Sequence, residues 1–405
     1  MAPDPELPAL YTKSRMPHAL FIVAEVITTV LTLAGMGYFV AALWAAAGFL
    51  RTRNLDRRNF APAVSILKSL KGCDPGMLEA FRTHCRQDYA GNYELLFGVA
   101  DAADPAMAAV EQLQREFPQL PIRLLHCPEQ LGSNKKISTL MQMERTARYD
   151  YLLINDSDIA VTPHYLTDVM RRFSTEEGAP EVGMVTALYR GRAHRTLGSY
   201  FESMGIATDF QPGVLLSIKV EGGLHYGLGS TLAVSRKALH AAGGLKALAD
   251  ELADDHVMGK RIDQAGFRVV LAGEVVETSV PAYRWRAFTD HQLRWLRTVR
   301  DARPGGYFGM IFTHGFGWAV INALVCAGST LSLALLAASL LLRHAMATVI
   351  AGRVLDDQQS ISALWLLPAR DLTQMALWIA GFCGNTIVWR GERFTLKNGK
   401  LVARG

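Results

Sequence analysis

Cysteine is scarce in this sequence and shows no pairing pattern. The 405 residues include five cysteines, and no two of them form a Cys-x-x-Cys pair. An odd number at irregular spacings favours reduced or buried thiols over a disulfide framework. The sequence also lacks a glycine-rich phosphate loop of the P-loop kind, internal repeats and low-complexity segments. It has no nucleic-acid-binding module, so its net charge of +5 is better explained by anionic lipid headgroups than by nucleic acid.

Long hydrophobic runs, by contrast, are abundant. Half of the residues are hydrophobic, and they concentrate in three blocks, at 18–50, 316–342 and 361–389. A helix needs about 20 apolar residues to span a bilayer, and the first block exceeds this with Glu25 as its one charged residue. The third block contains Pro368, Arg370 and Asp371, which favours a broken or interfacial helix. We therefore expect up to three spans beside a soluble domain.

Basic residues follow the first block, precede the second and follow the third, and they predict the topology. They are Arg51, Arg53, Arg57 and Arg58 after the first block, Arg294, Arg297, Arg300 and Arg303 before the second, and Arg390, Arg393, Lys397, Lys400 and Arg404 after the third. By the positive-inside rule these flanks are cytoplasmic. The predicted N-terminus is therefore outside, and the large middle segment and the C-terminus are inside.

The middle segment alternates short apolar runs with helix-like stretches. The runs at 63–70, 93–101, 122–127, 151–157 and 183–189 are typical of strands, and 105–117 and 133–147 have helical spacing. This alternation predicts an α/β domain with a mostly parallel sheet. In such sheets, ligands bind at the carboxyl ends of the strands.

The motif "LLINDSDIAV" places Asp156 and Asp158 at the end of a predicted strand. Two carboxylates two positions apart offer hard oxygen ligands for Mg²⁺ or Mn²⁺, and a sugar nucleotide's diphosphate would supply further oxygens. The alternative is a turn with an N-cap, because Asp and Ser are also common there.

Two further acidic pairs are also candidates for a functional site. Asp101 and Asp104 come just after the second predicted strand, at the same edge of the sheet. Asp254 and Asp255 begin a probable helix, where a capping or helix-dipole role competes with a functional one.

Residues 285–299 predict an amphipathic helix next to the membrane. At 100° per residue, Trp285, Phe288, Trp295 and Val299 share one face. Arg286, Arg294 and Arg297 fall roughly opposite. Such a helix lies in the membrane interface or docks on the soluble domain. The two interpretations can hold together, with one face of the helix in the interface and the other on the domain.

Taken in order, these motifs resemble the membrane glycosyltransferases of the ceramide glucosyltransferase type. The resemblance rests on Asp104, "DSD" at 156–158, "ADD" at 253–255 and "HQLRW" at 291–295, with "VSILKSLKGCDPGM", "NKKI" and "GGLKALADELADDHVMGKRI". It covers about residues 20–395 and is greatest for a bacterial branch linked to hopanoid biosynthesis. It implies a GT-A-type, Rossmann-like domain with transmembrane helices at both ends. It also implies a location in the bacterial inner membrane with the catalytic domain cytoplasmic.

The resemblance also implies roles for single residues. Asp255 is the candidate general base, and Asp156 and Asp158 are the candidate metal ligands. The candidate donor-binding residues are Asp101, Asp104, Lys136, Asp156, His291, Arg294 and Trp295. His291 stands where the family has Gln or Arg, three residues before Arg294. Lys136 is alternatively a solvated helix residue.

The expected reaction is an inverting transfer of N-acetylglucosamine from UDP to a hopanoid polyol, with a β linkage. Alternatives are UDP-glucose with ceramide, another lipid such as diacylglycerol, a processive polysaccharide synthase, and a non-enzymatic membrane scaffold. The apolar stretch at 195–226 is expected to help form the acceptor mouth. The expected division is a tail and span at 1–50, the catalytic domain at 51–283, the amphipathic helix at 284–310, a membrane region at 311–390 and a tail at 391–405.

Overall fold

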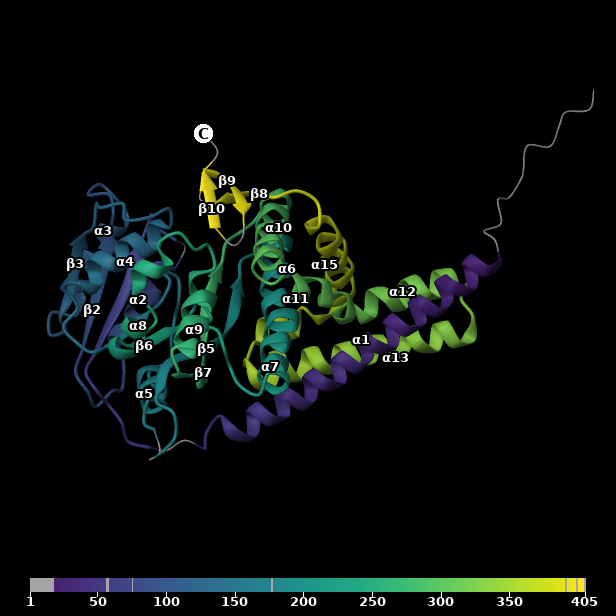
Figure 1. Cartoon of the computed structure of the whole chain (residues 1–405), viewed down its shortest axis with the longest axis horizontal. Helices are drawn as coiled ribbons and strands as arrows, with labels where there is room; N and C mark the ends of the chain where they lie inside the picture. Colours follow the sequence, from purple (N-terminus) through teal and green to yellow (C-terminus); the bar gives the residue numbers. More distant parts are fainter. Residues whose placement is uncertain are drawn as a thin grey trace, which may run out of the picture.

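The computed structural model describes residues 18–55, 58–74, 76–175, 178–389, 392–397 and 400–403. An α/β domain occupies one end of the molecule, and a long arm made of α1, α12 and α13 projects from the other (Figure 1). Residues 1–17 of the expected N-terminal tail, and Arg57, Arg390 and Arg404 of the basic flanks, lie outside the described residues.

The strands form a seven-stranded sheet and a small three-stranded one. Their bounds are β1 Val64–Leu70, β2 Tyr93–Val99, β3 Ile122–His126, β4 Tyr151–Ile154, β5 Val182–Ala193, β6 Leu232–Ser235, β7 Arg268–Val280, β8 Thr386–Trp389, β9 Glu392–Lys397 and β10 Lys400–Ala403. The large sheet has the order β3-β2-β1-β4-β6-β5-β7. Only β6 runs antiparallel to its neighbours there, so the sheet is mostly parallel, as predicted.

The helices divide between the domain and the membrane-proximal part. In the domain they are α2 Met77–Cys85, α3 Ala106–Glu116, α4 Lys135–Glu144, α5 Tyr165–Arg171, α6 Leu197–Gly205, η1 Ile206–Phe210, α7 Gln211–Val220, α8 Arg236–Ala241, η2 Leu245–Leu248 and α9 Asp254–Gln264. The others are α1 His18–Thr52, α10 Trp285–Ala302, α11 Pro304–Gly309, η3 Met310–Thr313, α12 Gly315–Val325, α13 Thr330–Thr348, η4 Val349–Val354, α14 Gln358–Ser362, η5 Leu364–Leu366 and α15 Leu367–Gly381.

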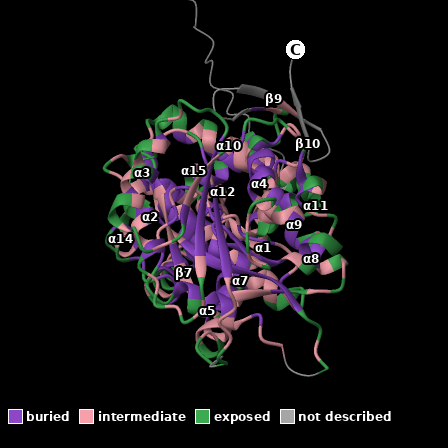
Figure 2. Cartoon of the chain, turned by 90° about the vertical axis from the view of Figure 1, so that its left-hand side faces the viewer, coloured by how far each residue is buried: buried purple, intermediate pink, exposed green. Residues whose placement is uncertain are grey.

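The core lies on both faces of the large sheet (Figure 2). Neighbouring strand residues point to opposite faces, so Ile66 packs with α2, α3 and α5, whereas Leu67 packs with α4, α8 and α9. Both strands β1 and β2 are buried almost throughout, which explains their continuous apolar runs. Helix α4 begins at a side-chain cap, Asn134, which accepts a hydrogen bond from Ile137 N, whereas α2 and α3 begin without one.

The membrane helices differ from the predicted blocks. Among the described residues, α1 and the helix from Thr330 to Val354 are long and apolar enough to cross a membrane. Pro304–Thr313 and Gly315–Val325 form a third span only if this pair, bent by 57°, counts as one. The expected single span at 316–342 is wrong, because the chain turns at Ala327 (φ 49°) and Gly328 (φ 71°).

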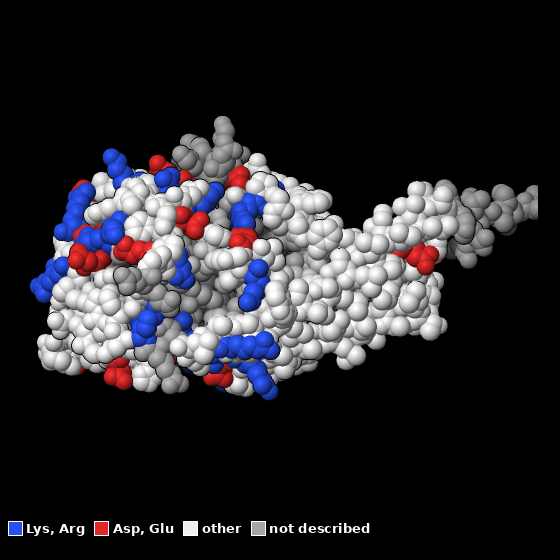
Figure 3. All heavy atoms as spheres, turned by 60° about the horizontal axis from the view of Figure 1, so that its bottom comes forward, with Lys and Arg blue, Asp and Glu red and all other residues white. Residues whose placement is uncertain are grey.

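The third block does not form a helix of spanning length. Its main helix, α15, has 15 residues, and it contacts α6, α10 and α12. This agrees with the broken-helix alternative. On the face drawn in Figure 3, charged side chains crowd the α/β domain and are almost absent from the helical arm. That distribution suits an arm embedded in lipid.

Candidate active site

One large cavity, of about 1180 Å³, lies at the carboxyl ends of the parallel strands. It continues past α9 and α10 to residues of α1, α12, α13 and α15. Every candidate residue from the sequence lines it: Asp101, Asp104, Lys136, Asp156, Asp158, Asp255, His291, Arg294 and Trp295. Acidic residues distant in the sequence therefore share one cleft that reaches from the sheet edge to the membrane helices.

Asp104 joins the ends of the first two strands. Its two carboxylate oxygens each lie 3.0 Å from Gly72 N, and one also accepts a hydrogen bond from Ala106 N at 2.9 Å. It therefore holds the loop after β1 against the start of α3. Asp101 is exposed and accepts a hydrogen bond from Ala103 N in the same loop.

The two aspartates after β4 have different partners. Asp156 Oδ1 is 2.7 Å from Lys136 Nζ. Asp158 Oδ2 accepts hydrogen bonds from Thr278 Oγ1 at 2.5 Å and Ser279 N at 3.2 Å, so it is fixed against β7. Burial, and then the neighbouring Asp156, raise the pKa of Asp158 above its usual range.

Lys136 connects the acidic groups. Besides Asp156, its ammonium lies 3.7 Å from Asp254 Oδ2. Burial would lower the pKa of Lys136, but the surrounding carboxylates outweigh burial and raise it. Lys136 is therefore a charged residue inside the cavity rather than a solvated helix residue.

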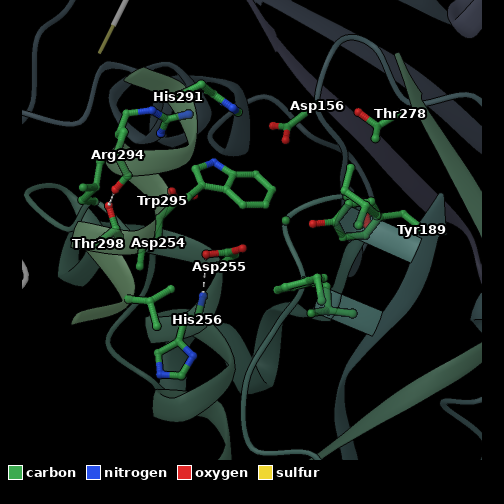
Figure 4. Close-up of a pocket in the computed structure, with 18 of the residues that line it drawn as sticks. Asp156, Tyr189, Asp254, Asp255, His256, Thr278, His291, Arg294, Trp295 and Thr298 are labelled. Carbon is green, nitrogen blue, oxygen red and sulfur yellow. Dashed lines mark hydrogen bonds between the residues drawn. The ribbon is translucent and has the colours of Figure 1, made fainter. Parts of the chain in front are cut away.

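Asp254 and Asp255 begin α9, and their carboxylates are held differently. Asp254 is buried, and its Oδ2 has no hydrogen-bond partner among the described residues. Burial, partly offset by Lys136, raises its pKa to about 6. Asp255 projects into the middle of the cavity (Figure 4), where its Oδ1 accepts a hydrogen bond from His256 N at 2.7 Å. Burial also raises the pKa of Asp255.

A close backbone approach places Asp255 there. A Cβ on Gly259, one turn along α9, would lie 2.3 Å from Gly227 N. A Cβ on Gly229 would lie 3.0 Å from Asp255 Oδ2. Glycine at these positions lets the loop before β6 pack directly against α9.

Helix α10 supplies one wall of the cavity. His291 Nδ1 lies 3.0 Å from Glu202 Oε2, and its ring stacks on Tyr283 with a centroid separation of 5.3 Å. Arg294 and Trp295 both line the cavity. Both were predicted to bind the donor, and that role stays a prediction.

The far side of α10 is docked on the protein. Arg297 donates hydrogen bonds to the carbonyls of Thr386 and Cys383, and Arg300 donates to those of Gly381 and Gly384. These arginines tie α10 to the turn between α15 and β8. The docked-helix alternative thus describes this face, whereas Trp285 remains about half exposed.

Three cavity-proximal residues were missed in the sequence. Tyr189, on β5, faces Asp255 across the cavity (Figure 4), and burial together with Asp255 and Glu202 raises its pKa. Glu202, on α6, is buried against His291. Lys68 is fully buried beneath the DSD motif and donates to the Asp156 carbonyl at 3.0 Å. Burial lowers its pKa to about 7. A lysine inside the apolar run of β1 was the available signal for Lys68.

The donor set fits a divalent cation in part. Asp156 and Asp158 provide hard oxygen atoms at one strand end, of the kind that Mg²⁺ and Mn²⁺ prefer. Within the described ranges, however, no group of three His, Cys, Asp or Glu side chains has the geometry of a metal site. A cation held here would need further oxygens from a bound diphosphate.

The stretch at 195–226 lines part of the cavity, and its role as an acceptor mouth stays a prediction. It forms α6, the π-helical turn η1 and α7. Its cavity-lining residues are Glu202, Gly205, Ile206, Asp209, Phe210, Gly213, Val214, Ser217 and Tyr226.

The mostly parallel sheet, with acidic groups converging at its strand ends, has a GT-A-like fold. Residues 27–402 match glycosyl transferase family 21, and the chain belongs to this family. Its enzymatic class is therefore that of a glycosyltransferase.

Known proteins similar to this chain include two from Caenorhabditis elegans. Ceramide glucosyltransferase 3 is 24% identical over 356 residues, covering 84% of this chain and 74% of the relative. Ceramide glucosyltransferase 1 is 22% identical over 359 residues, covering 84% and 73%. Among solved structures, mannosyltransferase PcManGT from Pyrobaculum calidifontis, in complex with GDP-Man and Mn²⁺, has a TM-score of 0.52 and 19% identity. The match covers 89% of this chain and 97% of that one, and the likeness is one of fold.

Proposed function

We propose that this glycosyltransferase moves a hexose from a UDP-sugar to a hydroxyl of a membrane lipid, with inversion at the anomeric carbon. The observation that carries the proposal is the single cavity that joins the acidic strand ends to the membrane helices. A lipid acceptor keeps its tail in the bilayer, because removing it is costly. Its hydroxyl must therefore meet the donor at such a junction.

In the proposed reaction, the acceptor hydroxyl attacks the anomeric carbon as the bond to the diphosphate breaks. Asp255 takes the hydroxyl proton as general base, and UDP leaves with the bonding electrons. One base and one in-line displacement invert the anomeric centre, which predicts a β-linked product. Tyr189, facing Asp255, helps to orient the acceptor oxygen.

The leaving diphosphate requires positive charge. Lys136 and Arg294 line the cavity as charged donors for its oxygens. Asp156 and Asp158 would hold Mg²⁺ or Mn²⁺, which neutralises charge on a leaving diphosphate. His291, held by Glu202, contributes to the donor side of the cavity. Asp101, Asp104 and Trp295 are proposed to contact the donor as well.

Two acceptors are proposed. The sequence motifs favour N-acetylglucosamine transfer from UDP to a hopanoid polyol. The ceramide glucosyltransferases among the relatives support UDP-glucose and ceramide instead. In both cases α1 and α13 are proposed to cross the membrane, and the basic flanks support a cytoplasmic catalytic domain.

The test is transfer by the detergent-solubilised protein, using labelled UDP-sugars and a panel of bacteriohopanetetrol, ceramide and diacylglycerol. We expect one lipid to be glycosylated. Asp255→Asn should lower kcat by about 10²- to 10⁴-fold, the usual contribution of a general base, while UDP binding measured by calorimetry stays near that of the wild type. An unchanged kcat would remove Asp255 from the mechanism. A protein that binds UDP but glycosylates no lipid would instead support the scaffold alternative.

A further inference from the structure

We propose that the membrane end of the cavity is a binding site for the polar head of the lipid acceptor, and that it selects heads with several hydrogen-bonding groups. This inference rests on the proposed function and concerns the part of the cavity remote from the DSD motif. The residues that would contact the head are Tyr38 on α1, His314 before α12 and Gln374 on α15, all of which line the cavity.

Beside these residues lies a buried ion cluster, whose four members also line the cavity. Arg343 on α13 makes hydrogen bonds of 2.7 Å to both carboxylate oxygens of Asp371 and one of 2.6 Å to Asp209. Arg370 pairs with the other oxygen of Asp209. Arg343 and Arg370 are only 3% and 4% exposed. Two arginines and two aspartates balance in charge, so the cluster forms a rigid, neutral polar wall.

The π-helical turn η1 brings Asp209 into this cluster. It spans Ile206–Phe210 between α6 and α7, and π-helical turns are often found at functional sites. Arg343 Nη1 also donates to the Thr208 carbonyl at 2.7 Å. The cluster therefore joins the segment that lines the acceptor side of the cavity to the candidate span α13.

The cavity-facing groups, unlike the cluster, are not satisfied by the protein. His314 Nε2 is buried and has no hydrogen-bond partner among the described residues. In the same part of the chain, neither the Tyr38 hydroxyl nor the Gln374 amide makes a side-chain hydrogen bond, although both line the cavity. A buried polar group without a partner costs about 1–3 kcal/mol. His314 Nε2 is such a group, and the Tyr38 hydroxyl and the Gln374 amide line the same chamber without a side-chain hydrogen bond to the described residues. This arrangement suits a ligand that pairs with them.

The chemistry of these groups indicates the ligand. A phenol, an imidazole and a primary amide all donate and accept hydrogen bonds and carry no fixed charge. They match hydroxyl and amide groups better than a phosphate, because the two arginines nearby are already paired with carboxylates. A Cβ on Gly213 would have Tyr38 Oη, at 3.9 Å, as its nearest neighbour, so this glycine leaves room beside the Tyr38 hydroxyl.

The alternative is that the cluster only fastens the membrane helices to the domain. Substitutions that spare the cluster separate the two explanations. Tyr38→Phe and Gln374→Leu remove cavity-facing polar groups and leave the four charged residues intact. Tyr149→Phe and Gln264→Leu are matched controls, because neither residue lines the cavity.

The assay measures acceptor KM with bacteriohopanetetrol and ceramide, whose heads carry several polar groups, and with hexadecanol, which has a single hydroxyl. Each variant should raise KM for the polar lipid that the protein uses by about 5- to 10-fold, the value of one hydrogen bond. KM for the UDP-sugar, hydrolysis of the donor without acceptor, and KM for hexadecanol should not change. An equal rise in KM with every acceptor, or no change in KM with any of them, would overturn the inference.

Equilibrium binding of labelled ceramide and bacteriohopanetetrol to the solubilised protein separates this inference from the proposed function. If the variants weaken lipid binding while the wild type transfers no sugar, the head-group site stands and the proposed reaction fails. If the wild type transfers sugar and the variants bind the lipid normally, the reaction stands and the head-group site fails. The melting temperature of each variant checks that it is folded.

Discussion

Replacing Asp254 by Asn should stabilise the protein at neutral and alkaline pH. Burial raises the pKa of this carboxyl from 3.8 to about 6, and that net value already includes the attraction of Lys136. At about 1.4 kcal/mol for each pH unit, holding Asp254 ionised above pH 6 costs roughly 3 kcal/mol. Asn has nearly the same shape and no charge, so most of this cost should disappear.

The sign of the pH dependence follows from the same values. The folded-state pKa lies above the unfolded one, so the folded protein binds this proton more tightly. The resulting stabilisation is fully present below about pH 4 and is lost as the pH rises through about 6. Asn imitates the protonated form. The gain of the variant should therefore be a few degrees in Tm near pH 8 and should shrink near pH 5.

The assay is thermal unfolding of the detergent-solubilised protein across this pH range. Asp290→Asn is the control, since it removes the same charge from an exposed position. Equal melting temperatures for the wild type and Asp254→Asn near pH 8, or a gain that does not depend on pH, would refute the reasoning. The acid limb of kcat/KM should also move to lower pH, because Asp255 loses a negatively charged neighbour.

Two further predictions concern the metal and the membrane helices. Chelation with EDTA should lower the rate of transfer at least 10-fold, and Mn²⁺ or Mg²⁺ should restore it, because Asp156 and Asp158 would hold the cation. Full activity in EDTA would instead mean that Lys136 alone neutralises the charge of the leaving diphosphate. A Cβ on Gly35 would lie 2.2 Å from Gly315 Cα, whereas one on Gly37 would have nothing within 4 Å. Gly35→Val should therefore lower the Tm in detergent by several degrees, because overpacking costs about 1–3 kcal/mol. Gly37→Val should leave the Tm unchanged, and equal effects of the two substitutions would argue against close packing of α1 on α12.

The parallel half of the sheet could be predicted from the sequence because its strands are buried on both faces. Strands β1, β2 and β4 appear as continuous apolar runs, and the acidic residues that follow them mark their carboxyl ends. Strands β6 and β7 were not predicted. The first has only four residues, and the second mixes apolar and polar residues without the regular alternation that indicates a half-buried strand.

The membrane region shows the limit of hydropathy. Apolar residues continue through the turn at Ala327 and Gly328, so composition alone joins α12 to α13. Conversely, Arg343 lies inside α13, although in the sequence it interrupts the apolar run expected of a membrane span. Its cost is offset by Asp209 and Asp371, which lie far from it in the sequence.

The cavity side chains were predictable where they belong to short motifs and not where they depend on packing. Asp156, Asp158 and Asp255 stand in local patterns. Glu202 and Tyr189 do not: each becomes part of the cavity because α6 and β5 meet α10 and α9 there. No spacing rule in one sequence connects Glu202 with His291, which lie 89 positions apart.

The expected boundary at residue 283 divides the sequence but does not divide the cavity. Asp255 belongs to the segment before it, and Arg294 and Trp295 belong to the helix after it, yet all three line the same space. Tyr38 and Arg343, from α1 and α13, line it as well. Residues 51–283 alone would therefore leave the cavity open on the side where a lipid would enter. The candidate membrane helices act as walls of the cavity. In the proposed function, their packing against the domain is therefore a condition for binding the acceptor and not only for anchoring.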